Sequence, residues 1–484
     1  MRSALLVSTY EMGRQPFGLA SAAAWLRAEG LAVTCVDAAK EKLAQSVLRA
    51  TGLIAFHLPM HTATRLAGPL IVTARRVNPS ARICAFGLYG PLNAEWLRSI
   101  GVDEVFGGEF EQDLAKWAAL KGCATSTDAQ ARTLVAQPFP PPLAVNSSER
   151  RRDTLKREPR EGDRAARVLP RIHFLVPDRS GLPPLSKYAT LQMPSGERRL
   201  VGYTEASRGC RHLCRHCPVV PIYNGQFRVV QSDVVLADVA AQVAAGARHI
   251  TFGDPDFFNG PTHALRIVEA LHAAHPEVTY DVTIKVEHLL RHRDLLPRLA
   301  VTGCAFVISA VESLDDRVLG LLDKGHTRAD FFEAVALCRE AGVTLVPTFV
   351  AFHPWLSLES YCDLLDTIAR LDLVDHVAPI QLAIRLLVPE GSRLLTLDEM
   401  RAHIDRFDPA TLTYRWAHPD PRVDALQRDV TSLVGLRLAT DRRVVFAEIA
   451  ALAHDRAGLP HPVGDSRPVR ARATVPYLNE PWYC

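Results

Sequence analysis

The stretch Ser207-Arg-Gly-Cys-Arg-His-Leu-Cys-Arg-His-Cys-Pro218 contains three cysteines, Cys210, Cys214 and Cys217, in the spacing C-x-x-x-C-x-x-C. Three thiolates this close together can hold one iron–sulfur cluster from a single loop. A 4Fe–4S cluster needs four ligands, so this loop would leave one iron open to a small molecule. A structural zinc site is the alternative, because His212 or His216 can supply a fourth zinc ligand.

The cysteine spacing resembles that of radical S-adenosylmethionine (SAM) enzymes. The resemblance implies that the three cysteines hold a 4Fe–4S cluster and that its open iron binds the amino and carboxylate groups of SAM. It also implies reductive cleavage of SAM to a 5′-deoxyadenosyl radical, with a flavodoxin or ferredoxin as electron donor. A disulfide is disfavoured because cytosolic thiols stay reduced. The other seven cysteines are scattered along the chain, at Cys35, Cys84, Cys123, Cys304, Cys338, Cys362 and Cys484. Most of them stand in apolar strings and are expected to be small core residues.

Apolar runs alternate with amphipathic stretches from Leu200 onward, which predicts βα units. Six strands are expected, at 201–205, within 244–252, and at 280–284, 305–311, 344–350 and 377–382. Six units fit the partial TIM barrel, (β/α)6, of the radical SAM family, and we assign this core to residues 196–395. In such barrels the chemistry lies at the C-terminal ends of the strands, where the cysteine loop also begins.

Polar residues that directly follow these strands are the candidates for binding SAM or substrate. Gly253, Asp254 and Asp256 follow the second strand, where the family places its contact with the SAM amino group. A simple Asx turn is the alternative for these two carboxylates.

Three further candidates follow later strands. Glu312 and Ser313 match a Glu-Ser pair with which family members contact SAM, and Arg385 follows the sixth strand, where it can pair with a carboxylate. For Ser313 the alternative is an N-cap of the next helix, with Asp315 or Asp316 in its first turn.

Residues 1–123 also alternate between strand and helix, which predicts a flavodoxin-like parallel sheet with helices on both faces. Strands are expected at 4–8, 32–36, 53–57, 83–86 and 104–106, and a helix at 19–29. Ligands of such sheets bind beyond the carboxyl ends of the strands. The loops at that edge are 9–17, 57–63, 87–91 and 107–111.

This N-terminal part resembles the cobalamin-binding-like domain that precedes many radical SAM cores. The resemblance rests on Gln15-Pro-Phe-Gly-Leu-Ala20 and on Val105-Phe-Gly-Gly-Glu-Phe-Glu111. The Asp-x-His-x-x-Gly motif of many cobalamin proteins is absent after the first strand, so bound cobalamin would lack that histidine under its cobalt. Two interpretations stay open: the domain binds cobalamin, or it is a relic that binds nothing or binds substrate.

The remaining segments are a linker at 124–195 and a C-terminal extension at 396–484. The linker is rich in proline and charge, and short strands are expected within it at 172–176 and 188–192. The extension is expected to add helices and a tail. The segments 379–392 and Glu480-Pro-Trp-Tyr-Cys484 resemble a subgroup whose tails end Cys-Cys-Ala-Glu-Pro or Cys-selenocysteine-Ala-Glu-Pro. The resemblance implies a redox-active, catalytic Cys484, and a sequence cut short at a selenocysteine codon would explain why the second Cys or selenocysteine does not follow. The alternative is a free terminal cysteine without a role.

The charge and the hydrophobicity of the chain argue against two classes of protein, nucleic-acid-binding and membrane-spanning. The chain has 56 basic and 53 acidic side chains and a net charge of +3, which gives no reason to expect a nucleic-acid partner. No run of about 18 apolar residues predicts a membrane helix, and the first residues lack signal-peptide features, so a cytoplasmic protein is expected. We therefore expect a radical SAM enzyme of unknown substrate. The alternatives are a cobalamin-dependent radical SAM methyltransferase and a non-catalytic zinc or iron–sulfur protein.

Overall fold

The computed structural model describes residues 3–120, 172–437, 440–460 and 475–478. Its N-terminal part is a parallel sheet with the strand order β2-β1-β3-β4-β5. This is the flavodoxin-like order. The strands are β1 (Ser3–Ser8), β2 (Ala32–Asp37), β3 (Leu53–His57), β4 (Arg82–Phe86) and β5 (Glu104–Phe106). The predicted flavodoxin-like sheet is confirmed, with strand boundaries displaced by at most one residue.

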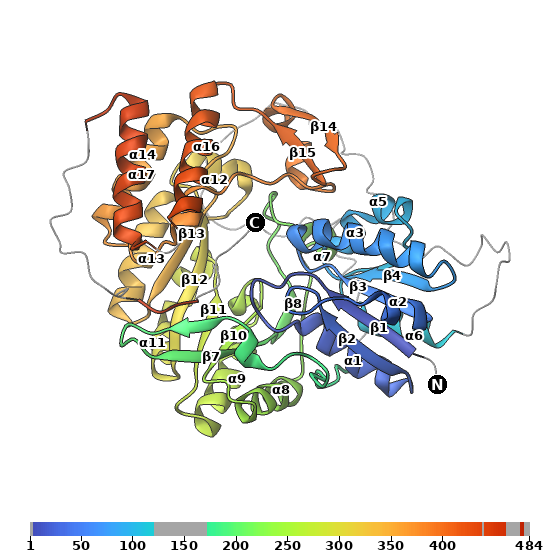
Figure 1. Cartoon of the computed structure of the whole chain (residues 1–484). Coiled ribbons are helices and arrows are strands. Elements are labelled where there is room, and N and C mark those ends of the chain that lie inside the picture. Colours follow the sequence, from blue (N-terminus) through green and yellow to red (C-terminus); the bar gives the residue numbers. More distant parts are fainter. Residues whose placement is uncertain (1–2, 121–171, 438–439, 461–474, 479–484) are drawn as a thin grey trace, which may run out of the picture. The chain divides into compact units, whose positions relative to one another are not determined.

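Helices cover both faces of this sheet, and Figure 1 shows α1 and α3 on opposite sides of it. Leu5 and Val7 pack on one side with the helices that follow β2, β3 and β4, and Leu6 packs on the other side with the helices that follow β1 and β5. A strand buried on both faces reads as a continuous apolar run, as β1 does. The helices are α1 (Phe17–Ala28), α2 (Gln45–Ala50), α3 (His61–Val77), α4 (Tyr89–Leu92), α5 (Ala94–Ser99) and α6 (Glu111–Ala119).

A second sheet forms an open half-barrel with the order β13-β12-β11-β10-β7-β6-β16. Its five parallel strands are β7 (Arg198–Thr204), β10 (His249–Phe252), β11 (Thr279–Thr283), β12 (Cys304–Glu312) and β13 (Leu345–Phe349). Two short antiparallel strands, β6 (Thr190–Gln192) and β16 (Tyr477–Leu478), extend the edge next to β7. The expected strand near residue 190 is thus present, whereas 172–176 forms no strand.

Helices follow the strands of the half-barrel along the chain, as in a TIM-like fold (Figure 1). They are α8 (Ser232–Ala244), α9 (Pro261–Ala274), α10 (Val286–Arg291), α11 (Leu296–Val301), α12 (Asp316–Leu322), α13 (Arg328–Glu340) and α14 (Leu358–Arg370).

The sixth barrel strand, which was expected at 377–382, does not form. Residues Pro379–Leu382 form a 3₁₀ turn instead. Pro379 has no N–H to donate to a sheet ladder, which disfavours a strand there. After this turn, an isolated parallel bridge joins Arg385 to Phe352, which lies beyond the end of β13.

The cysteine loop is closed at its neck by a two-stranded antiparallel ladder. Strands β8 (Ser207–Gly209) and β9 (Phe227–Val229) pair across it, and the short helix α7 (Val220–Tyr223) lies inside it. Gly209 has φ +77, and a Cβ there would lie 2.5 Å from the carbonyl oxygen of Gln226. Only glycine therefore fits directly before Cys210.

The C-terminal part adds helices, as expected, and also a β-hairpin that was not expected. The elements are α15 (Asp398–Arg401), the hairpin strands β14 (Ile404–Asp408) and β15 (Thr413–Trp416), α16 (Pro421–Leu436) and α17 (Arg442–Ala457). Among the residues that the structure describes, no helix combines the length and apolarity needed to span a bilayer.

Candidate functional site

The three cysteines of the loop lie beyond the C-terminal end of β7. Cys210 and Cys214 are buried, and Cys217 is half-buried. Burial raises the pKa of the Cys210 thiol and raises that of Cys217 to about 12, so these thiols ionise only beside a cation. None of the described cysteines forms a disulfide. Buried, unpaired thiols in one loop fit the donor set of an iron–sulfur cluster.

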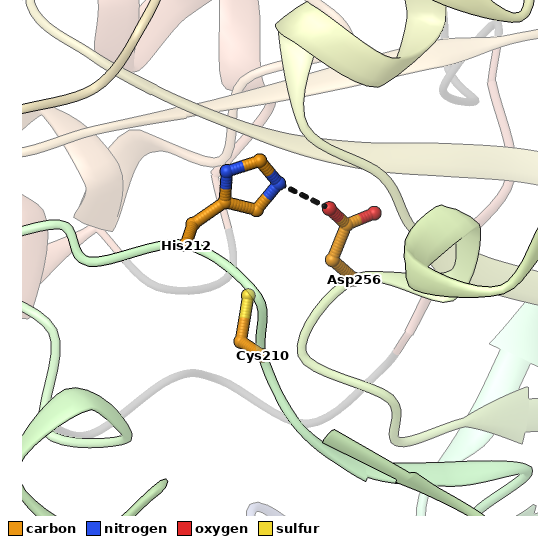
Figure 2. A group of neighbouring side chains, drawn as sticks. All are labelled: Cys210, His212 and Asp256. Carbon is orange, nitrogen blue, oxygen red and sulfur yellow. Dashed lines mark ion pairs between the residues drawn. The ribbon is translucent and has the colours of Figure 1, made fainter. Parts of the chain in front are cut away.

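His212 is held beside the first cysteine by a buried carboxylate (Figure 2). Its Nε2 lies 3.3 Å from Oδ2 of Asp256, and one ligand atom each of Cys210, His212 and Asp256 lies within 4.8 Å of the others. Nδ1 of His288 is 2.7 Å from the same carboxylate oxygen. Burial alone would raise the pKa of Asp256, but His212 and His288 outweigh it and lower that pKa to about 2. Asp256 is therefore an anion near neutral pH, and its carboxylate orients the His212 ring.

Gly253 and Asp254 follow β10 but contact the protein itself. Asp254 is 2 % exposed, and it accepts hydrogen bonds from the backbone N of Ala206 at 2.9 Å and the hydroxyl of Ser207 at 2.5 Å. Burial raises its pKa to about 7, although these hydrogen bonds oppose the shift. A Cβ on Gly253 would lie 1.7 Å from the hydroxyl oxygen of Tyr203. Both residues shape the turn before the cysteine loop, and their contact with a cofactor stays a prediction.

Glu312 ends β12 and reaches the cysteine loop. Its Oε1 is 3.1 Å from Nε2 of His216 and 3.6 Å from Nζ of Lys324. Burial alone would raise the pKa of Glu312, but Lys324 and His216 lower it to about 2. Glu312 also has φ +72, an uncommon backbone conformation for a residue other than glycine. An ionised carboxylate is thus held at the barrel mouth in a conformation that costs backbone energy.

Ser313 does not cap the following helix. Asp315 is the N-cap of α12, where its carboxylate accepts from the backbone N of Arg317 and Val318. The Ser313 hydroxyl instead accepts a hydrogen bond from the backbone N of Asp315 at 3.1 Å, in the loop directly before the helix. Capping by Ser313 was therefore the wrong alternative, because the helix begins two residues later than that placement requires.

A pocket of about 190 Å³ opens at the ends of β12 and β13. Glu312, Ser313, His353 and Trp355 contribute to its lining. His353 is buried, and burial lowers its pKa to about 4, so its ring is neutral near pH 7. This pocket offers room for part of a ligand next to the Glu-Ser pair.

Arg385 pairs with a carboxylate, as expected, but the carboxylate belongs to the chain. Its guanidinium is 2.7 Å from Asp424 and also donates to the carbonyl oxygen of Trp416 at 2.6 Å. It lies over the Trp416 ring at 3.4 Å from the centroid. These contacts join the core to α16 and the hairpin, and a cofactor role for Arg385 gains no support from them.

A second pocket involves both sheets, whose described residues within 1–118 and 174–484 form one unit. The four loops expected at the carboxyl edge of the N-terminal sheet each contribute to it, through Glu11, His57, Gly87 and Gly108. From the half-barrel, Tyr203, Ser207 and Gly253 line it. The pocket has a volume of about 230 Å³, and the space between its walls is about 970 Å³ when the solvent at its open mouth is counted.

Sequence reasoning missed the charged residues that join these two parts. Arg208 lies in β8, and its guanidinium is 2.5 Å from Glu111 and 2.7 Å from Glu205. The rings of Phe110 and Phe174 lie 5.6 and 5.0 Å from that guanidinium. The only available signal was position, because Arg208 stands two residues before Cys210. Pairing across about 100 residues leaves no periodic pattern in a sequence.

Two expectations concern cysteines outside the cysteine loop. Those described are buried or nearly so, which confirms the core placement of Cys35, Cys84, Cys304, Cys338 and Cys362. Cys123 and the catalytic candidate Cys484 lie outside the described residues, so the redox role of Cys484 stays a prediction.

Comparison with known proteins gives the family of the core. Residues 204–371 match the family model of the radical SAM superfamily. A tRNA-2-methylthio-N(6)-dimethylallyladenosine synthase of Chlorobium phaeobacteroides (strain BS1) is 27% identical over 186 residues, which is 35% of this chain and 39% of that protein. The chain thus spans well under half the length of this curated relative.

Two solved structures share the fold over most of the chain. The cobalamin-dependent SAM radical enzyme OxsB, with aqua-cobalamin and SAM bound, has a TM-score of 0.65 at 14% identity and covers 96% of this chain and 77% of its own. The radical SAM methyltransferase TsrM from Kitasatospora setae, with cobalamin and a [4Fe-4S] cluster, has a TM-score of 0.55 at 17% identity and covers 77% and 70%. The chain therefore carries a domain of the radical SAM superfamily behind a flavodoxin-like domain, in the fold of the cobalamin-dependent radical SAM enzymes.

Proposed function

We propose that this protein is a cobalamin-dependent radical SAM enzyme. The observation that carries the proposal is the pocket shared by the two sheets. Ser207 and Gly253 line it from the half-barrel and stand beside the cysteine loop, while His57 and Gly87 line it from the flavodoxin-like domain. A corrinoid there would be adjacent to SAM at the cluster.

Cys210, Cys214 and Cys217 would hold the cluster. When bound, a 4Fe–4S cluster with one open iron binds SAM and supplies the electron that cleaves its sulfonium. The chain's own residues then orient and exclude water. Glu312 is held as an anion beside the loop and can accept hydrogen bonds from the SAM ribose or ammonium. Asp256 keeps His212 beside Cys210, in the way that outer carboxylates fix residues around a metal centre.

Two glycines in the wall of the shared pocket pack closely against neighbouring protein atoms. A Cβ on Gly18 would lie 2.2 Å from the His57 ring, and a Cβ on Gly87 would lie 2.9 Å from the carbonyl oxygen of Leu58. Both glycines therefore make room for protein atoms in the wall of the pocket, the His57 ring beside Gly18 and the Leu58 carbonyl beside Gly87. When bound, a corrinoid supplies a cobalt centre that can carry a methyl group. The open mouth leaves space for the parts of a corrinoid that exceed the volume of the pocket.

Methyl transfer is the reaction outcome that we favour. It is supported by the position of the shared pocket, which Ser207 and Gly209 line directly before the cysteine loop, and by the likeness to TsrM, a methyltransferase with cobalamin and a cluster bound. A flavodoxin or ferredoxin is the electron donor that such chemistry requires. The substrate class stays open, and a net charge of +3 gives no support to a tRNA substrate like that of the curated relative.

The test is an anaerobic incubation of reconstituted protein with SAM and a reductant, with and without cobalamin. We expect iron and acid-labile sulfide near four per chain, together with 5′-deoxyadenosine or methylated cobalamin among the products. Stoichiometric zinc with no cluster after reconstitution would favour the alternative, in which a non-catalytic zinc site uses the three cysteines and His212. If SAM cleavage proceeds equally well with and without cobalamin, and the protein binds no corrinoid, the protein is a radical SAM enzyme that does not use cobalamin.

A further inference from the structure

His57 and Glu11 lie at the position in the sheet where a ligand is expected. In the order β2-β1-β3-β4-β5 the chain reverses direction between β1 and β3, which opens a crevice beyond their carboxyl ends. Glu11 stands in the loop after β1, and His57 is the last residue of β3. Both line the pocket that the two sheets share.

The His57 ring is fixed on several sides. Its Nδ1 lies 2.6 Å from Oε1 of Glu11, and the two side chains are 7% and 12% exposed. The rings of Phe86 and Phe110 pack at centroid distances of 5.0 and 6.1 Å. The absence of a side chain at Gly18 makes room for the ring, since a Cβ there would lie 2.2 Å from both Cε1 and Nε2.

The hydrogen bond to Glu11 decides which nitrogen is available. A carboxylate accepts the proton on Nδ1, so Nε2 of the neutral ring carries the lone pair. Among the described residues Nε2 has no hydrogen-bond partner. Nε2 is not fully buried, and His57 lines the pocket, so a ligand in the pocket can reach this nitrogen. A histidine with one nitrogen on a carboxylate and the other free is the usual arrangement of a metal-binding imidazole.

We propose that Nε2 of His57 is an axial ligand to the cobalt of a corrinoid in this pocket, with Glu11 as the residue that positions the ring. This rests on the proposed function. The bond forms by ligand exchange: the Nε2 lone pair replaces a water, or the base of the corrinoid's own tail, and no electron is transferred. The chain lacks the histidine motif after its first strand, and the third strand supplies the ligand in its place.

The test uses cobinamide, a corrinoid without an attached base, so that any axial nitrogen must come from the protein. Full-length protein without a polyhistidine tag is loaded in imidazole-free buffer, reduced to the cobalt(II) state and measured by electron paramagnetic resonance. We expect each cobalt line to split into three through one ¹⁴N ligand. Protein grown with ¹⁵N-histidine should show doublets instead, because ¹⁵N has spin one-half.

Three variants identify the residue. His57→Phe keeps an aromatic ring, removes both ring nitrogens and should lose the nitrogen splitting, while His272→Phe on α9, outside the pocket, should keep it. Glu11→Gln should keep the splitting but weaken cobinamide binding by about 10- to 100-fold, the usual effect of removing an outer carboxylate.

The outcomes separate this inference from the proposed function. Cobinamide that binds to the unaltered protein without nitrogen splitting would overturn the role of His57 and leave corrinoid binding intact. Persistence of the splitting in folded His57→Phe would also overturn it. No binding of cobinamide or cobalamin would instead refute the corrinoid part of the proposed function. If His57→Phe fails to fold, the ¹⁵N-histidine spectrum and Glu11→Gln still decide.

Discussion

Breaking the ion pair between Arg208 and Glu111 should destabilise the fold strongly, and Glu111→Gln tests this. The pair joins β8, next to the cysteine loop, to the start of α6. The side chains are 8% and 1% exposed, and Nη1 of Arg208 lies 2.5 Å from Oε1 of Glu111. The hydroxyl of Ser21 donates to the same oxygen at 2.7 Å. The substitution keeps the shape of the side chain and removes only its charge.

The expected loss follows from burial. Removing one partner of a buried ion pair costs about 3–5 kcal/mol, because the other charge stays in a medium of low polarity. Arg208 keeps a second carboxylate, Glu205, at 2.7 Å, which places the expected loss at the lower end. We expect about 3 kcal/mol, or roughly a hundredfold change in the unfolding equilibrium.

The assay is urea unfolding followed by circular dichroism and by tryptophan fluorescence. Coincident curves from the two probes would justify a single free energy of unfolding. Glu269→Gln is the matched control, because Glu269 forms an exposed pair with Arg298 and its loss should cost about 1 kcal/mol or less. If Glu111→Gln costs no more than this control, the buried pair does not stabilise the contact between the two sheets, and the reasoning is refuted.

Three further substitutions test the site. Cys214→Ala should abolish the brown colour and iron content of reconstituted protein, because two thiolates are too few to hold the cluster; a retained cluster absorbance would contradict this. Glu312→Gln should weaken SAM binding at least tenfold by calorimetry, since a charged hydrogen bond contributes about 1.5–3 kcal/mol, and unchanged affinity in folded protein would show that Glu312 does not contact SAM. Burial raises the Asp254 pKa to about 7, above its unfolded value, so its stabilising contribution is full below pH 4 and is lost as pH rises through 7. The free energy of unfolding of the unaltered protein should therefore fall by a few kcal/mol more between pH 4 and pH 8 than that of Asp254→Asn. Equal falls in the two proteins would contradict the raised pKa of Asp254.

Local patterns were enough to predict most of the architecture. The apolar runs at 4–8 and 53–57 are buried on both faces, and such strands carry their own signal. The spacing of Cys210, Cys214 and Cys217 is equally local, because one loop supplies all three thiols. The prediction of a sixth strand was wrong because an apolar run indicates burial but does not distinguish a strand from a turn. Pro379 lies at the start of the 3₁₀ turn that forms there instead.

The sequence alone determined the two βα-patterned segments, the cysteine loop and the strand ends where ligands are expected. Only the tertiary structure decided which polar residues meet there. It paired Glu11 with His57, Arg208 with Glu111, and Arg385 with Asp424. Each pair joins residues that are 39 to 97 positions apart. Such partners come together through the order of strands in a sheet and the packing of one sheet's loops on another, and neither is written in local periodicity.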